Sequence, residues 1–112
     1  MKKIKLYQQG DVLIYKVDEE KENKGKNLKI TPRGYVLAEG EHTGHAHVID
    51  LPQIDKVLAF MDNEMEIFLK VQEDVIVRHE EHNSVSLPPG NYIIDYVNEV
   101  DPFTEEVNKV AD

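Results

Sequence analysis

The sequence predicts an all-β domain: a small barrel or sandwich of about eight short strands, with one helix at the C-terminal end, about residues 102–111. Apolar and polar side chains alternate with a period of two along most of the chain, which is typical of strands. Turn-forming residues separate the alternating runs. In residues 87–91, LPPGN, proline fixes φ, and glycine or asparagine accepts positive φ. A chain of 112 residues suffices for one hydrophobic core, so we expect a single β-domain over residues 1–112.

The expected strands are short runs rich in valine, isoleucine, leucine and aromatic residues. They cover residues 4–6, 12–15, 36–38, 48–49, 57–61, 65–71, 75–77 and 92–97. Only the end of the chain has helical features. Asp101 is suited to cap a helix, Pro102 suits the first helical position, and Phe103, Val107 and Val110 recur at helical spacing.

Composition narrows the classes of function. The net charge is −9; residues 1–33 carry a surplus of +4, and residues 34–112 a deficit of −13. A protein that binds the nucleic-acid backbone needs the opposite balance, so nucleic acid is not an expected partner. No run reaches the roughly 20 apolar residues of a membrane span. The basic start is followed by QQGD at residues 8–11 rather than by a signal-peptide core, so the expected location is the cytoplasm.

All five histidines lie in two short segments, GEHTGHAH at residues 40–47 and RHEEH at residues 78–82. Side chains at i and i+2 on a strand share a face, so His45 and His47 project together, and Ile49 and Leu51 continue that apolar face. By the same rule His79 continues the inward face of Val75 and Val77. The pattern predicts three imidazoles that point into one interior from two strands.

The other two histidines have weaker positional support. His82 follows His79 by three residues and joins the group only if the strand bends near Glu80 and Glu81. His42 lies in a glycine-flanked loop that could cover the mouth of the site.

A divalent metal is the cofactor that this pattern favours. The chain has no cysteine, so imidazole, carboxylate, carbonyl oxygen or water must hold any metal. The expected metal ligands are His45, His47, His79, His82 and His42. Glu41, Glu80 and Glu81 are the nearest carboxylates, and one of them could serve as a ligand, as a partner to an imidazole or as a catalytic base. Two alternatives stay open: metal-free acid–base chemistry, and histidines with only a structural role.

The motifs GEHTGHAH, RHEEH, LPPGNY and VNEVDPF resemble a group of small bacterial and phage proteins without an assigned activity, and the resemblance spans residues 10–103. The H-x-H pair with a later histidine also resembles cupins, which hold a metal in this way. The chain departs from the cupin pattern: Leu51 and Pro52 stand where cupins have glutamate, and the Pro-Gly turn follows the second histidine motif. This departure favours an analogous small barrel over a standard cupin.

The leading hypothesis is therefore a divalent-metal-binding β-domain, compatible with a metal-dependent hydrolase or a cupin-like enzyme. The residue types leave zinc, nickel, manganese and iron open, and they reveal neither the small-molecule substrate nor whether the protein is an enzyme. The alternative is an acidic interaction protein, such as a phage-type inhibitor or a nucleic-acid mimic, motivated by the charge of residues 34–112. An exposed edge strand would be compatible with a homodimer.

Overall fold

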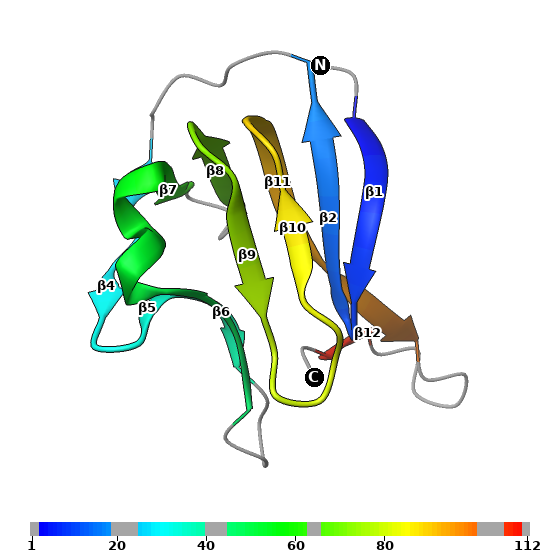
Figure 1. Cartoon of the computed structure of the whole chain (residues 1–112). Coiled ribbons are helices and arrows are strands. Elements are labelled where there is room, and N and C mark those ends of the chain that lie inside the picture. The colour runs from blue at the N-terminus through cyan, green and yellow to red at the C-terminus, as the bar shows by residue number, and fades with distance from the viewer. Residues whose placement is uncertain (1–2, 19–24, 40–44, 63–65, 101–106, 111–112) are drawn as a thin grey trace.

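The computed structural model describes residues 3–18, 25–39, 45–62, 66–100 and 107–110, with side chains up to residue 96. Within these residues the chain is all-β, as the alternation predicts, and its strands form two antiparallel sheets (Figure 1). Strands β9 and β10 of one sheet lie in front of β8 and β11 of the other in this view.

The first sheet contains the longest strand, β11, near its centre. Its order is β1-β2-β11-β8-β7-β3, and β12 pairs with β11 outside this path. The strands are β1 (Lys3–Gln9), β2 (Val12–Val17), β3 (Lys26–Asn27), β7 (Val57–Met61), β8 (Ile67–Val71), β11 (Gly90–Val100) and β12 (Val107–Val110).

The second sheet is smaller and has the order β10-β9-β6-β5-β4. Its strands are β4 (Ile30–Thr31), β5 (Gly34–Glu39), β6 (Ala46–Asp50), β9 (Val75–Arg78) and β10 (Val85–Leu87). Strand β6 occupies the middle of this sheet between β5 and β9, and its first four residues are all buried.

The main hydrophobic core lies between the two sheets. The first sheet contributes Ile14, Leu69 and Ile94, and the second contributes Ile49 and Val77, all almost inaccessible to solvent. Burial of one such side chain stabilises the fold by roughly 1.5–3 kcal/mol. Because both sheets face this core, inward side chains near the strand ends are also shielded from water.

The structure corrects the expectation of a barrel or sandwich of about eight short strands: the number of strands is wrong and no closed barrel is present within the described ranges. Twelve strands are present among the described residues, several of them only two to four residues long. The first sheet ends at β1 and β3 and the second at β10 and β4, and no ladder between the described strands joins these edges into a closed barrel. The standard cupin barrel is therefore also absent from the described part.

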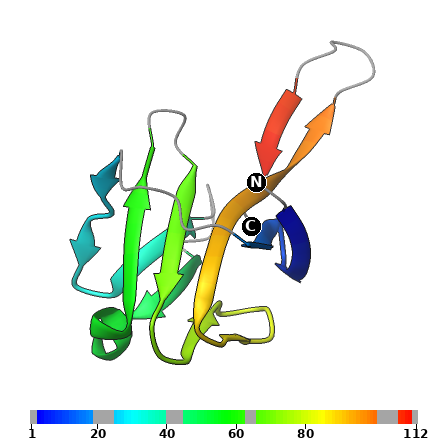
Figure 2. The ribbon, with the colours of Figure 1, turned by 90° about the horizontal axis from the view of Figure 1, so that it is seen from above.

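The expected C-terminal helix is wrong. Val107–Val110 forms β12, which pairs with the end of β11 in a register that sets Val97 opposite Val110 and Val100 opposite Val107. Valine favours strands, and the long β11 offers β12 a free backbone edge, so pairing prevails over the weak helical spacing. The two strands project away from the rest of the molecule (Figure 2). The expected cap at Asp101 and the start of the helix lie outside the described residues.

A second correction concerns Leu51, which we expected to continue the inward face of the strand. Strand β6 ends at Asp50, and a 3-10 helix, η1, covers Leu51–Lys56. Pro52 lies at the start of η1, where a missing backbone N–H is tolerated. Proline cannot donate a hydrogen bond to a strand ladder, so β6 does not continue through this residue. The Leu51 side chain is consequently exposed.

No helix among the described residues is long and apolar enough to cross a membrane.

A matched pair of substitutions tests the assignment of strand faces. Leu69 on β8 is 2% exposed, whereas Leu58 on the adjacent β7 is 51% exposed. We expect Leu69→Ala to lower the free energy of unfolding by about 2–5 kcal/mol and Leu58→Ala to lower it by about 0.5 kcal/mol. Urea denaturation measures both values, and equal losses would contradict the assignment.

Candidate functional site

Four of the five histidines meet at one end of the molecule. His47 lies in β6 and His45 directly precedes it, while His79 directly follows β9 and His82 lies in the loop before β10. Ring centroids are 4.3 Å apart for His47 and His79, 4.5 Å for His79 and His82, 5.7 Å for His45 and His79, and 6.2 Å for His47 and His82. We call these four residues the histidine cluster. His42 lies outside the described residues.

The pairing of β6 with β9 explains why the cluster forms. These antiparallel strands set Ile49 opposite Val77 and Val48 opposite Arg78. Continuing this register by two residues places His47 opposite His79 on the same face, and opposite side chains on neighbouring strands have Cβ atoms about 4.5–5.5 Å apart. The convergence that alternation predicts therefore follows from one local register.

His82 reaches the cluster because the chain bends over residues 80–82. The Glu81 backbone N–H donates a hydrogen bond to Nδ1 of His79 at 3.0 Å, which tightens the bend. The bend near Glu80 and Glu81, on which we made the membership of His82 conditional, is thus present.

The four members differ in burial. His47 is 0% exposed and His79 is 4% exposed, so both rings form a floor that continues the core. His45 and His82 are partly exposed and form the rim. The Nε2 atoms of both floor histidines are themselves inaccessible to solvent. A ligand would thus approach from the rim and meet the floor inside.

Gln9, the last residue of β1, holds the floor in place. Its Oε1 lies 2.8 Å from Nδ1 of His47. Its Nε2 donates to the backbone carbonyls of Val77 and Asn83, both at 2.9 Å. The side chain therefore connects the first sheet with β9, with the loop before β10 and with His47.

Gln9 is a residue of the site that the sequence pattern does not indicate. A polar residue before a Gly-Asp turn is ordinary, and local spacing gives no indication of contacts 68 and 74 residues away. Gln9 is one of three buried polar side chains among the residues with described burial, and the other two are His47 and His79.

The two carboxylates beside His79 have different surroundings. Glu80 accepts a hydrogen bond from the Ala46 backbone N–H at 2.9 Å and pairs with Arg33 at 2.7 Å. The Ala46 hydrogen bond, with a smaller effect from Arg33, lowers the pKa of Glu80 from its ordinary value of 4.5 to about 2. Glu80 is therefore a weak base whose oxygens are engaged, and it anchors the start of β6.

Glu81 remains the more available carboxylate. Its side chain is mostly exposed, and its Oε1 lies 3.3 Å from Nδ1 of His45 at the rim. Glu41, the third carboxylate that we considered as a catalytic residue, lies outside the described residues.

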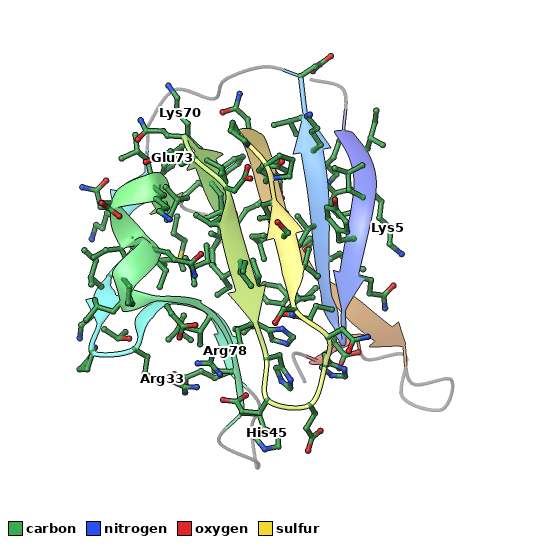
Figure 3. The ribbon with its side chains drawn as sticks, viewed as in Figure 1. Lys5, Arg33, His45, Lys70, Glu73 and Arg78 are labelled. Atoms are coloured by element: carbon green, nitrogen blue, oxygen red, sulfur yellow. The ribbon has the colours of Figure 1, made fainter. Side chains whose placement is uncertain are left out.

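A second ion pair supports the same end of the sheet. Arg78 donates two hydrogen bonds, both 2.9 Å, to the carboxylate of Asp50, and this interaction lowers the pKa of Asp50. Arg33, Arg78 and His45 lie at one end of the molecule, opposite Lys70 and Glu73 (Figure 3). Arg78 joins β9 to β6, and Arg33 joins the turn between β4 and β5 to Glu80, just outside the cluster.

As placed, no group of three or more histidine, aspartate or glutamate side chains among the described residues could hold a metal ion. The ring pairs differ in orientation: the planes of His47 and His82 are nearly parallel, at 8°, two pairs are tilted by 37° and 38°, and the planes of His45 and His79 are nearly perpendicular, at 80°. A metal requires nitrogen atoms that all point to one position about 2.0–2.1 Å away. The imidazoles are therefore gathered, but not aimed at one point.

Residues 8–96 match the family described as a domain of unknown function, DUF8820. The chain belongs to this family. The match covers Gln9 and all five histidines. Neither the curated proteins nor the solved structures give a match.

The low pKa of Glu80 predicts how stability depends on pH. A carboxylate whose pKa is lowered on folding stabilises the folded state above its ordinary pKa, and this contribution is lost as the pH falls from 4.5 towards about 2. We expect Glu80→Gln to destabilise the protein at neutral pH, with a difference from wild type that shrinks below about pH 4.

Denaturation curves recorded at several pH values measure this difference. Glu73→Gln, at an exposed position, is the matched control and should show no such trend. A constant difference between Glu80→Gln and wild type across the pH range would refute the anchoring role of the Glu80 carboxylate.

Proposed function

We propose that the histidine cluster binds a divalent transition metal, with His47 and His79 as floor ligands and His45 and His82 as rim ligands. The observation that carries this proposal is the meeting of four imidazoles from β6, β9 and the loop before β10, with centroid distances of 4.3–6.2 Å. Neutral imidazole is the ligand that zinc, nickel and iron accept readily, whereas magnesium and calcium prefer oxygen.

Ring rotation is the movement that binding requires. The rim histidines lie outside regular strands, so their side chains can turn without breaking a sheet ladder. An unfavourable side-chain torsion costs on the order of 1 kcal/mol, whereas a metal bound by three or four protein ligands contributes on the order of 10 kcal/mol. The free energy of metal binding therefore exceeds the cost of turning the side chains, which favours closure of the cluster around a metal.

A site of this composition is suited to catalysis. A metal held by three of these histidines keeps an open position for water or substrate, and a metal held by all four keeps one when it takes five or six ligands, unlike closed cysteine-rich sites. Glu81 is the described carboxylate best suited to act as a general base, because its side chain is accessible and lies beside the rim. Glu80 is engaged by Ala46 and Arg33 and does not meet this requirement. Metal-dependent hydrolysis is therefore the reaction class that we propose.

The first experiment is metal analysis of the untagged protein, since a histidine tag would itself bind metal. We expect about one equivalent of zinc, nickel, manganese or iron after purification, or after metal is added to the stripped protein. Metal at 100 times its dissociation constant should stabilise the fold by about 2.7 kcal/mol, which raises the melting temperature. Magnesium, which prefers oxygen ligands, is the negative control.

Rim variants separate metal binding from folding. We expect His45→Ala and His82→Ala to melt like the metal-free wild type, since both side chains are partly exposed, but to bind metal at least about tenfold more weakly. Glu73→Gln, at the opposite end of the molecule, should bind as wild type does.

Less than about a tenth of an equivalent in wild type, with no thermal shift on addition of zinc or nickel, would refute the proposal. A metal-free protein that instead binds a basic protein in a salt-sensitive manner would favour the alternative of an acidic interaction protein.

A further inference from the structure

We infer that Gln9 is a positioning residue of the histidine cluster: its amide holds His47 with a proton on Nδ1 and so directs the Nε2 lone pair of His47 to a ligand. The tautomer assignment stands on the hydrogen bonds alone. The ligand role of Nε2 rests on the proposed metal binding.

The orientation of the Gln9 amide follows from its partners. One end of the amide lies 2.9 Å from two backbone carbonyl oxygens, those of Val77 and Asn83. Carbonyl oxygens only accept, so this end must be the NH₂ group, whose two hydrogens match the two acceptors. The reversed amide would set an oxygen against two oxygens in a buried position. The other end, 2.8 Å from Nδ1 of His47, is therefore the carbonyl oxygen.

This orientation determines the state of His47. The Gln9 oxygen accepts, so Nδ1 of His47 donates and carries a proton. A neutral imidazole has one N–H and one lone pair, which leaves the lone pair on Nε2. Histidines that bind metals commonly donate their other ring N–H to an oxygen, which sets the tautomer and the ring orientation. Gln9 provides this arrangement from a strand of the other sheet.

His79 is held in the opposite state. Its Nδ1 accepts the Glu81 backbone N–H at 3.0 Å, so the proton of a neutral His79 ring lies on Nε2. His79 can thus bind a metal only after the Glu81 hydrogen bond breaks. This asymmetry is a second reason, beside ring orientation, why the described cluster is not a ready metal site. It assigns His47 as the first floor ligand and His79 as the one that rearranges.

Gln9 also affects the rim through the loop before β10. Its bond to the Asn83 carbonyl fixes the residue that follows His82. One amide therefore restrains both a floor ring and the segment that carries a rim ring.

The test uses nitrogen-15 NMR of the metal-free protein at about pH 8, above the ordinary pKa of histidine. Long-range proton–nitrogen correlations distinguish protonated from unprotonated ring nitrogens. We expect protonated Nδ1 for His47 and protonated Nε2 for His79 in wild type. Gln9→Met removes the acceptor at similar size and should abolish the preference of His47. Gln9→Glu keeps an acceptor oxygen beside Nδ1 of His47 and should preserve the Nδ1 proton, while its second oxygen faces the carbonyls of Val77 and Asn83 and should lower stability.

Gln8→Met is the matched control, because Gln8 is exposed and bonds only locally, to Lys5 and the Gly10 carbonyl. A merely structural Gln9 would alter stability in Gln9→Met but leave the His47 tautomer unchanged. That result would overturn the inference, as would a wild-type His47 with its proton on Nε2. If Gln9→Met fails to fold, the wild-type spectrum alone still shows which ring nitrogen of His47 carries the proton.

Zinc titration then tests the ligand role. We expect Gln9→Met to bind zinc 10–100-fold more weakly than Gln8→Met, and the Glu81 amide signal to shift when zinc binds. Zinc binding with equal affinity in both variants would overturn the positioning role. Absence of zinc binding in wild type would refute the proposed function and the ligand role of Nε2, while the predicted tautomers would still confirm the hydrogen-bond assignment.

Discussion

The antiparallel register of β6 and β9 is the constraint on which the polar interior of this protein depends. The pairing of Ile49 with Val77 extends the hydrophobic core to the end of the sheet, and two residues further it brings His47 and His79 together. The same pairing sets Val48 opposite Arg78, whose side chain reaches Asp50 on β6. A one-residue slip of either strand would turn the side chains of that strand to the other face. Packing of Ile49 and Val77 in the core therefore sets the register of β6 and β9, and this register places His47 beside His79.

Two buried imidazoles are costly unless their nitrogens are satisfied, since an unpaired buried polar group costs about 1–3 kcal/mol. The protein meets part of this cost with groups from outside the two strands. Gln9 comes from the first sheet, and the Glu81 amide comes from the loop before β10. The Gln9 contact depends on the two sheets lying face to face, whereas the Glu81 contact is local to the bend after β9. The packing of the sheets and the chemistry of the cluster are therefore coupled, and Gln9 is the link between them.

Alternation along the strands predicted the all-β class and the meeting of His45, His47 and His79. Burial of one strand face is visible in the sequence, because apolar and polar residues then alternate with a period of two. Competing local signals caused the errors. Helical spacing near Val107 masked a strand, and Pro52 ended β6 before Leu51 could face inward. Gln9 could not have been found in this way, because its three partners lie 38, 68 and 74 residues away, and two of them are backbone carbonyls, which any residue type can supply.

The contrast between Glu80 and Glu81 shows how the backbone assigns roles that sequence alone leaves equal. The bend that carries His82 towards the cluster turns Glu80 to the Ala46 amide and leaves the Glu81 carboxylate at the rim. The Glu81 backbone N–H meanwhile occupies Nδ1 of His79. A ligand that draws His79 into coordination must therefore release the residue whose carboxylate stands beside His45. If the cluster binds a metal as we propose, the Glu81 N–H must leave His79, and the same residue carries the carboxylate beside His45.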